Sequence, residues 1–503
     1  MATEDANNVG SHAEAPKKKI LLNAFYMSTV GHLSPGQWKD PTDKSATKRN
    51  LKYWIELVQL LERGGINALF LADTYGGYDT YEGSLDNCIR RAAQWPMTES
   101  HHREFPKLCT LVHYGAMAAA TKNLSFAITA STSFEPPFLL AKRFSTLDHF
   151  TGGRFGWNII TSWKKAAFKA IGIDTPIEHD QRYAQADEYL RVLYKLWEGS
   201  WADDAISPDP EHDSYADPDK IRTIKHQGKY FSLDTRHIVD PSPQRTPFLF
   251  QAGTSPAGSE FAATHAEAIF VSAHSPAVLR PKVDKIRQLA AAQGRDPRSV
   301  KFFATFTPVL GATDAEAAAR HAELKEYASV VGGLVLMSGW TGIDLSALPL
   351  DHEITAADSA EIHKVTSILE AFTATSDKIP KWTPRIIAEQ ASIGGLGPTS
   401  VGSPATVADE MERWIEEGDL DGFNIGYVTT PGSFEDVVDL LVPELQRRGI
   451  YPDIPRNDQH LTARERVYGE GQSGLRDDHP GSKYKYPVYK EEPPYSPESP
   501  AAA

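Results

Sequence analysis

The 503-residue sequence has little cysteine and no long apolar run. Its two cysteines, Cys88 and Cys109, are too few for a disulfide framework, and we expect both to pack as small apolar side chains. No stretch approaches the roughly 18 apolar residues of a transmembrane helix. The polar first twenty residues contain no signal-peptide core. These absences predict a cytoplasmic protein that has no membrane partner.

The chain also lacks an excess of positive charge and a dinucleotide-binding motif. Its net charge of -14 repels phosphate backbones, so we expect no nucleic-acid partner. A G-x-G-x-x-G pattern occurs at Gly469–Gly474, but no strand clearly precedes it and too little chain follows for a βαβ unit. The paired His101 and His102 have no zinc-ligand spacing around them. We therefore predict neither an NAD-binding domain nor a metal site.

What the sequence does contain is a series of short apolar runs separated by helical patterns. Continuous apolar runs without alternation are typical of parallel strands that are buried on both faces. Three- and four-residue apolar spacing predicts helices within 51–61, 183–197 and 406–415. The predicted strands are residues 20–26, 68–73, 124–129, 155–160, 248–253, 268–272, 301–306 and 422–427. Eight strands alternating with helices predict an α/β fold of the (β/α)8, or TIM-barrel, type, with a doubly wound sheet as the alternative.

The predicted barrel spans residues 17–451 and carries insertions. Residues 203–219 form an acidic, proline-containing loop, and residues 328–404 separate the last two strands. Long connections inside a compact domain are often functional lids, so we interpret 328–404 as a lid-like insertion. Residues 1–16 are predicted to be a disordered tail. Residues 452–503 are predicted to be an extended tail or a strap on a neighbouring subunit.

Polar or small residues follow the ends of several predicted strands. Asp73, Thr129 and Asn158 end three of them, and Gly253-Thr254-Ser255 ends a fourth. In (β/α)8 enzymes the active site lies at this face of the barrel. Asn158 interrupts an apolar strand, and a buried amide needs hydrogen-bond partners, so it is either a structural plug or faces a polar ligand. The shared placement of these residues favours a ligand.

The segment from Gly253 to Gly258 predicts an anion site, because glycines let backbone amides approach a phosphate and a helix start adds a positive dipole. Each residue also has a purely structural interpretation. Ser255 could cap the following helix, and His179 and Tyr183, four residues apart, could merely brace each other. A hydrolase that uses Ser255 is disfavoured, because Ala257 stands where a nucleophile elbow needs glycine.

Several segments carry a specific pattern when they are taken together. They are Leu147–Ser162 (LDHFTGGRFGWNIITS) and residues 70–73, 131–137, 179–183, 241–247, 251–256, 341–346 and 421–424. Together they resemble the bacterial-luciferase-like FMN-dependent monooxygenases, in the branch of nitrilotriacetate monooxygenase component A and long-chain alkane monooxygenase. The resemblance runs from about residue 20 to about residue 478. It implies a (β/α)8 barrel with insertions.

The resemblance also implies roles for individual residues. Tyr183 and Ser255 would bind the FMN phosphate, beside the anion-binding turn at Gly253 and Thr254. Asp73 and Thr129 would lie nearer the isoalloxazine ring. The implied FMN contacts are Asp73, Thr129, Asn158, His179, Tyr183 and Ser255. The candidate catalytic residues are Asn158 and three that match substrate-side positions, His32, Tyr78 and Gln94.

The implied enzyme is the oxygenase component of a two-component system. A separate NAD(P)H-dependent flavin reductase would supply reduced FMN, with or without docking. One atom of O2 would pass to a small or medium organic substrate through a flavin C4a-peroxide. The family suggests a homodimer or homotetramer. The alkane branch has a histidine where this chain has Trp163 and another in the segment corresponding to 332–337, so an alkane substrate is not implied. The alternative is a flavin-binding barrel without turnover, acting as a carrier or sensor.

Overall fold

The computed structural model describes residues 18–94, 110–354, 380–395, 397–452 and 460–493, and it confirms the predicted (β/α)8 barrel. Parallel pairing between β13 and β1, and between β10 and β11, closes the sheet into a cylinder and excludes the doubly wound alternative. All eight predicted strands are confirmed, with ends that shift by up to four residues. The barrel strands, in order around the cylinder, are β1 (Leu21–Met27), β2 (Ala68–Ala72), β3 (Ser125–Ser131), β4 (Phe155–Ile160), β9 (Phe248–Gln251), β10 (Ala268–Val271), β11 (Lys301–Leu310) and β13 (Gly422–Ile425).

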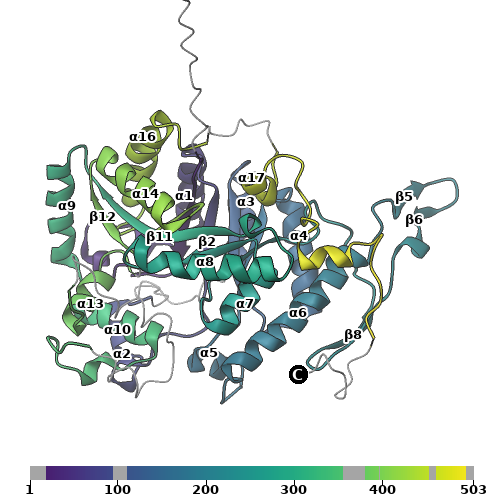
Figure 1. Cartoon of the computed structure of the whole chain (residues 1–503), viewed down its shortest axis with the longest axis horizontal. Coiled ribbons are helices and arrows are strands. Elements are labelled where there is room, and N and C mark those ends of the chain that lie inside the picture. The colour runs from purple at the N-terminus through teal and green to yellow at the C-terminus, as the bar shows by residue number, and fades with distance from the viewer. Residues whose placement is uncertain (1–17, 95–109, 355–379, 396, 453–459, 494–503) are drawn as a thin grey trace, which may run out of the picture.

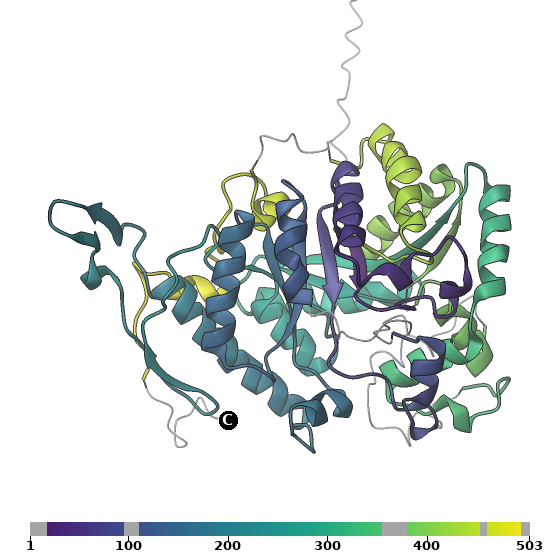
Figure 2. The ribbon, with the colours of Figure 1, turned by 180° about the vertical axis from the view of Figure 1, so that it is seen from behind.

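Helices surround the cylinder (Figures 1 and 2). The three predicted helices lie within α1, α6 and α14 and are confirmed. In the described segments no helix combines the length and the apolar character that a membrane crossing requires. The main helices are α1 (Leu51–Arg63), α3 (Thr110–Ala119), α4 (Pro137–Thr151), α6 (His179–Gly199), α7 (Pro256–His265), α8 (Pro276–Ala292), α9 (Asp314–Tyr327), α14 (Pro404–Gly418), α15 (Gly432–Asp436) and α16 (Val442–Arg447).

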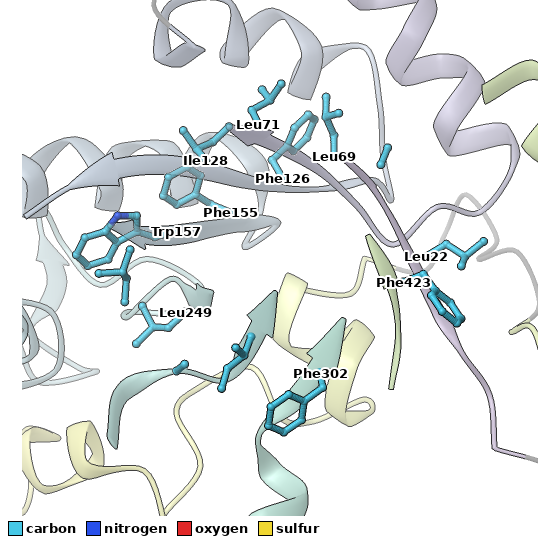
Figure 3. Close-up of a cluster of buried hydrophobic side chains, with 14 of the residues drawn as sticks. Leu22, Leu69, Leu71, Phe126, Ile128, Phe155, Trp157, Leu249, Phe302 and Phe423 are labelled. Atoms are coloured by element: carbon cyan, nitrogen blue, oxygen red, sulfur yellow. The ribbon is translucent and has the colours of Figure 1, made fainter. Parts of the chain in front are cut away.

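Successive side chains along each strand point to opposite faces of the sheet, so the core has an outer shell against the helices and an inner shell inside the cylinder. Side chains such as Leu69, Phe126 and Trp157 belong to the large cluster between the strands and the helices (Figure 3). Phe70 and Phe270 belong to the cluster inside the cylinder, where their rings stack with centroids 4.2 Å apart. Because both faces of each strand are buried, the strands are continuous apolar runs in the sequence. A polar residue on an inward position is therefore conspicuous.

Two insertions extend the barrel. Residues 203–219 contain a hairpin of β5 (Ile206–Asp209) and β6 (Ser214–Ala216), which projects from the body (Figure 1), and a second hairpin, β7 (Ile224–Gln227) and β8 (Ser232–Thr235), follows. The 328–404 insertion contains α10 (Val330–Thr341), α13 (Pro384–Ala391) and β12 (Thr399–Gly402), which pairs with β11. Residues 355–379 of this insertion lie outside the described segments.

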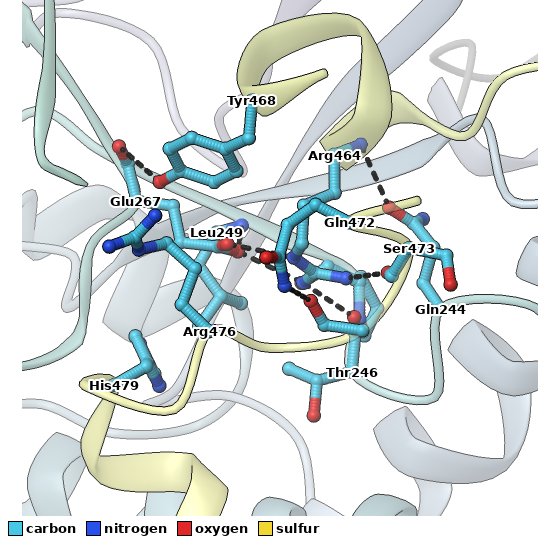
Figure 4. Close-up of polar contacts among 12 residues, drawn as sticks. Gln244, Thr246, Leu249, Glu267, Arg464, Tyr468, Gln472, Ser473, Arg476 and His479 are labelled. Carbon is cyan, nitrogen blue, oxygen red and sulfur yellow. Dashed lines mark hydrogen bonds and ion pairs between the residues drawn. The ribbon is translucent and has the colours of Figure 1, made fainter. Parts of the chain in front are cut away.

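The C-terminal segment does not extend freely over residues 460–493. It forms α17 (Ala463–Tyr468) and the 3-10 turn Pro480–Tyr484, and Arg464 is fully buried beside Glu267 (Figure 4). Ala463, Val467 and Tyr468 pack against the cluster inside the cylinder. Arg464 donates to the carbonyls of Thr246 and Pro247, so this segment covers the N-terminal end of the barrel, immediately before β9. The tail predicted at 1–16, Cys109, His101 and His102, residues 453–459 and residues 494–503 lie outside the described segments.

We expect Thr462→Ala to lower the free energy of unfolding by about 1 kcal/mol, because it removes the capping box at the start of α17. The Thr462 Oγ1 atom accepts from the Glu465 N–H at 3.2 Å, and the Glu465 carboxylate accepts from the Thr462 N–H at 2.9 Å. Urea denaturation measures the loss. Thr462→Ser keeps the oxygen and serves as the matched control. Equal stabilities of the alanine and serine variants would show that the cap contributes nothing.

Candidate active site

The polar residues predicted at the strand ends lie along one arc of the barrel mouth. Strands β2, β3, β4 and β9 are consecutive neighbours in the sheet. Asp73 and Gly253 stand just past the C-terminal ends of β2 and β9, and Thr129 and Asn158 stand near the C-terminal ends of β3 and β4. Thr129 and Asn158 are register partners. The structure therefore brings these four positions to the same face of the cylinder.

The Asn158 amide is only half satisfied. Its Nδ2 donates to Thr129 Oγ1 at 2.9 Å, while Oδ1 has no hydrogen-bond partner in the described part of the chain, although the side chain is 3% exposed. Leaving a buried amide oxygen unpaired costs free energy, so such an atom calls for an explanation. A structural plug would satisfy both ends of the amide. An acceptor left open at the barrel mouth instead fits a ligand that donates an N–H or O–H.

The turn predicted to bind an anion, here called the Tyr183–Ser255 cradle, lies at the start of α7, after the neighbouring strand β9. Ser255 Oγ accepts from the Gly258 N–H at 3.1 Å and lies 3.4 Å from His179 Nε2. A Cβ atom at Gly253 would stand 2.4 Å from the Tyr183 hydroxyl oxygen, so only glycine leaves this space open. Burial raises the pKa of Tyr183, which keeps its hydroxyl protonated and able to donate.

The structural interpretations of the same residues hold as well. Ser255 caps α7, and the His179 and Tyr183 rings pack edge to face with centroids 5.2 Å apart. Thr254 contributes its carbonyl, which accepts from Ser259 Oγ at 3.3 Å. Packing and capping hold the donors in place, so they do not compete with anion binding. The helix N-terminus adds its positive end to the same position.

Sequence reasoning missed Gln251, which ends β9. Its side chain is 2% exposed, and its Oε1 has no partner within the described residues. Its Nε2 would lie 2.6 Å from a Cβ atom at Gly253, so the amide borders the same cradle. Gln251 follows the apolar run Phe248-Leu249-Phe250. That is the signal that identified Asn158, and it could have identified Gln251.

The three substrate-side candidates are joined by hydrogen bonds. The Tyr78 hydroxyl donates to Gln94 Oε1 at 2.6 Å, and Gln94 Nε2 donates to the His32 carbonyl at 2.5 Å. Trp340, on α10 of the 328–404 insertion, donates from Nε1 to the Tyr78 hydroxyl oxygen at 2.8 Å. Gln94 adopts a φ of +54°, which is uncommon for a residue with a side chain. The arrangement fixes the orientation of Tyr78.

His32 is uncharged in this environment. Burial is the main cause that lowers its pKa well below the ordinary value, and the nearby Lys48 charge adds to the effect. Its ring packs edge to face on Phe25 with centroids 4.6 Å apart, and Nδ1 has no hydrogen-bond partner among the residues that the structure describes. A neutral imidazole can orient a ligand through one nitrogen, but it offers no positive charge.

Sequence reasoning also missed Lys164. Its ammonium lies 3.6 Å from the centroid of the Tyr78 ring and donates to Thr74 Oγ1 at 3.1 Å. Burial lowers its pKa to about 7. The neighbouring Trp163 is 40% exposed. The signal that could have identified Lys164 is the pair Lys164-Lys165, which lies in the loop after the fourth strand, at the rim where the active site was expected.

A hollow of about 440 Å³ lies elsewhere, beside the N-terminal end of β9. Its wall includes Asp240, Gln244, Arg245 and Gly474. The Arg245 guanidinium already donates to the carbonyls of Trp197, Glu198 and Trp201, and it pairs with Asp203. The sequence-predicted site residues do not line this hollow. The barrel mouth, not this hollow, therefore holds the candidate chemistry.

We expect Tyr78→Phe to lower the free energy of unfolding by about 1–3 kcal/mol, because it leaves the Trp340 N–H and the Gln94 Oε1 without their shared hydroxyl. Tyr81→Phe, in the same hydrophobic cluster, is the matched control and should cost less. Denaturant unfolding of both variants measures the difference. If the two variants lose equal stability, the Tyr78 hydroxyl has no special role.

The fold and the similarity to known proteins define the class of enzyme to which this chain belongs. A family model described as luciferase-like monooxygenase matches residues 29–420, and the chain belongs to that family of FMN-dependent monooxygenases. This confirms the family resemblance and the enzyme class predicted from the sequence. The polar arc lies at the barrel face where (β/α)8 enzymes have their active sites.

Individual relatives match almost the whole chain. The chain is 42% identical to the dimethyl-sulfide monooxygenase of Hyphomicrobium sulfonivorans over 469 residues, which are 93% of this chain and 94% of that protein. It is also 42% identical to the long-chain alkane monooxygenase of Geobacillus thermodenitrificans, over 93% of this chain and 98% of the relative.

Solved structures are similar over the same range. The crystal structure of DmoA from Hyphomicrobium sulfonivorans has a TM-score of 0.83, with 93% of this chain and 96% of that chain covered. The long-chain alkane monooxygenase LadA has a TM-score of 0.82, with 93% of this chain and 100% of that chain covered. Each of these two proteins is 41% identical in sequence to this chain. A riboflavin lyase with modified FMN and riboflavin has a TM-score of 0.81 at 32% identity, with 93% and 100% covered.

Proposed function

We propose that this chain is the oxygenase component of a two-component monooxygenase that uses reduced FMN and O2 to oxygenate a small or medium organic substrate. The single observation that carries the proposal is the open Asn158 Oδ1 at the same mouth as the Tyr183–Ser255 cradle. One ligand that combines an anion with N–H donors would engage both. FMN has a phosphate and an isoalloxazine ring with N–H groups, so it fits this pair of features.

The residues present fit FMN in the following way. The Tyr183 and Ser255 hydroxyls and His179 Nε2 would hold the phosphate, with Gly253 and Thr254 forming the turn around it. Asn158 Oδ1 would accept an N–H of the ring system, while Thr129 fixes the amide through its hydroxyl. Asp73 would lie on the ring side. When bound, reduced FMN supplies the electrons and the centre at which O2 is activated.

The rest of the site would hold the substrate and exclude water. Tyr78, Gln94 and His32 form a fixed chain of hydrogen bonds on the substrate side. Trp340 and Trp382 belong to the apolar cluster that α10 and α13 build around Tyr78. Excluding water protects a reactive oxygenating species from side reactions. We assign this shielding to the 328–404 insertion, in accord with its predicted role as a lid.

Electrons would come from a separate NAD(P)H-dependent flavin reductase. Every parallel strand in the described part of the chain belongs to one sheet, so that part has no second parallel sheet of the kind that binds a dinucleotide. Delivery needs only diffusion of reduced FMN, although docking would shorten the path. Assembly as a homodimer or homotetramer, which the family suggests, stays part of the proposal.

The test combines the recombinant chain with FMN, NADH, a generic flavin reductase and isotopically labelled O2. We expect the chain to bind FMN and to form a product that carries one labelled oxygen atom. Mass spectrometry of a broad substrate panel detects it. FMN binding with release of hydrogen peroxide and no labelled product from the whole panel would contradict the proposal and favour the carrier or sensor alternative.

A further inference from the structure

Lys164 lies where the flavin side and the substrate side of the site meet. Its ammonium donates to Thr74 Oγ1 at 3.1 Å, and Thr74 directly follows Asp73 at the end of β2. The same ammonium lies 3.6 Å from the centroid of the Tyr78 ring, whose hydroxyl holds Gln94. The Lys164 ammonium therefore contacts both the proposed flavin side, through Thr74, and the proposed substrate side, through Tyr78.

This charge is not neutralised by an ion pair. Within the segments that the structure describes, no carboxylate lies at salt-bridge distance from Lys164 Nζ; Asp73, Asp79 and the Cys88 thiol face it only from farther away. An ammonium has three N–H donors, and the bond to Thr74 uses one of them. A partly buried cation with two donors to spare is costly unless another group completes it. Burial lowers the pKa of Lys164 to about 7, which is the signature of that cost.

The backbone around Lys164 is held in place. Ser162 adopts a φ of +53°, and its Oγ bonds to Ser131 Oγ at 2.9 Å, while Ser133 Oγ donates to the Thr161 carbonyl at 2.7 Å. A residue with a side chain in this backbone region is strained, and such strain persists where surrounding contacts impose it, often at functional sites. The lysine is thus presented by a fixed loop at the end of β4.

The wall that Lys164 contacts is apolar and aromatic. Tyr78 belongs to a buried cluster that includes Met337, Trp340 and Trp382. A lysine over an aromatic face gains a cation–π interaction but keeps its capacity to bind an anion. A single positive charge on an apolar wall matches a ligand that has one negative group on an apolar body.

We propose that Lys164 is a specificity-determining residue that binds an oxyanion of the substrate, so that the site selects organic acids whose carboxylate or sulfonate is carried on an apolar or aromatic body. The inference rests on the proposed function, because the acid is the molecule to be oxygenated beside FMN. The carboxylate or sulfonate would take the two N–H donors that Thr74 leaves open. The apolar body would lie against the Tyr78 wall.

The test measures binding, not turnover. Two matched pairs serve as probes: phenylacetate with phenylacetamide, and benzenesulfonate with benzenesulfonamide. Quenching of tryptophan fluorescence and calorimetry give the affinities, with and without FMN. We expect the wild-type chain to bind each acid at least about tenfold more tightly than its amide, because the acid forms an ion pair with the ammonium, whereas the amide offers it only a neutral acceptor.

Two variants and one control locate the effect. Lys164→Met should abolish the preference for the acids, and Lys164→Arg should keep it. Lys165→Met removes the exposed neighbouring charge and should leave the preference unchanged. The preference in the wild type should weaken as pH rises through about 7, because the Lys164 ammonium then loses its proton. In Lys164→Arg it should persist, since arginine stays charged.

Equal affinities for acid and amide in the wild type, no binding of either acid at millimolar concentration, or an unchanged preference in Lys164→Met would each overturn the inference. Thermal unfolding and FMN titration of Lys164→Met check that the variant is folded. The FMN titration also separates the two proposals. A chain that prefers the acids but does not bind FMN would refute the monooxygenase site and leave the oxyanion site standing.

Discussion

Replacing Arg464 by methionine is expected to lower the free energy of unfolding by about 3–5 kcal/mol. The guanidinium is fully buried and donates to both Glu267 carboxylate oxygens, at 2.8 and 3.0 Å (Figure 4). It also donates to the Thr246 carbonyl at 2.9 Å and the Ser473 carbonyl at 2.5 Å. Methionine leaves the Glu267 carboxylate buried without its counter-ion, and desolvation of an unpaired charge is expensive.

Urea unfolding of the purified variant measures this loss. Arg413→Met is the matched control, because Arg413 pairs with Glu410 and Glu417 on the exposed face of α14 and should change stability by no more than about 1 kcal/mol. The double variant Arg464→Met with Glu267→Leu should recover part of the loss, since it removes both charges. If Arg464→Met costs no more than the control, the C-terminal segment does not anchor the barrel in the way its contacts indicate.

Gly253→Val is expected to weaken FMN binding by at least about 100-fold. The first added carbon would stand 2.4 Å from the Tyr183 hydroxyl oxygen and 2.6 Å from Gln251 Nε2, so both side chains must leave their positions. Valine also fills the space through which the backbone would approach a phosphate. The loss should appear as a lower affinity for FMN, with the secondary structure retained.

Fluorescence titration of FMN with the protein measures the affinity. Gly474→Ala is the matched control, because a methyl group there meets no atom within 4 Å. If the Gly253→Val protein folds and binds FMN as tightly as the control, the Tyr183–Ser255 cradle does not bind the phosphate. In that case the phosphate would have to bind elsewhere.

The sequence predicted the barrel well because its strands are buried on both faces. Such strands are continuous apolar runs, and a run like Phe155–Ile160 is visible without knowledge of its partners. The C-terminal segment was predicted less well. Helix α17 has only six residues, too few for a periodic pattern, and it is held by an ion pair between Arg464 and Glu267, which are 197 residues apart. Nothing local in the sequence indicates such a contact.

Some residues of the candidate site were predictable from the local sequence, and others were not. Asn158 was identifiable because it is a polar residue in an apolar strand, and strand periodicity fixes the direction in which it points. Lys164 and Trp340 are set by loops and by the 328–404 insertion. Trp340 donates to Tyr78 across 262 residues of sequence, and Lys164 reaches Tyr78 from a different strand end. Contacts of this kind follow from tertiary packing.

The most direct test of the central claim is an anaerobic calorimetric titration of the full chain with FMN in its reduced and oxidised forms. The account predicts saturable binding of one reduced FMN per chain, and a large loss of affinity in Gly253→Val but not in Gly474→Ala. No heat of binding for either form, or equal affinities in the two glycine variants, would contradict it.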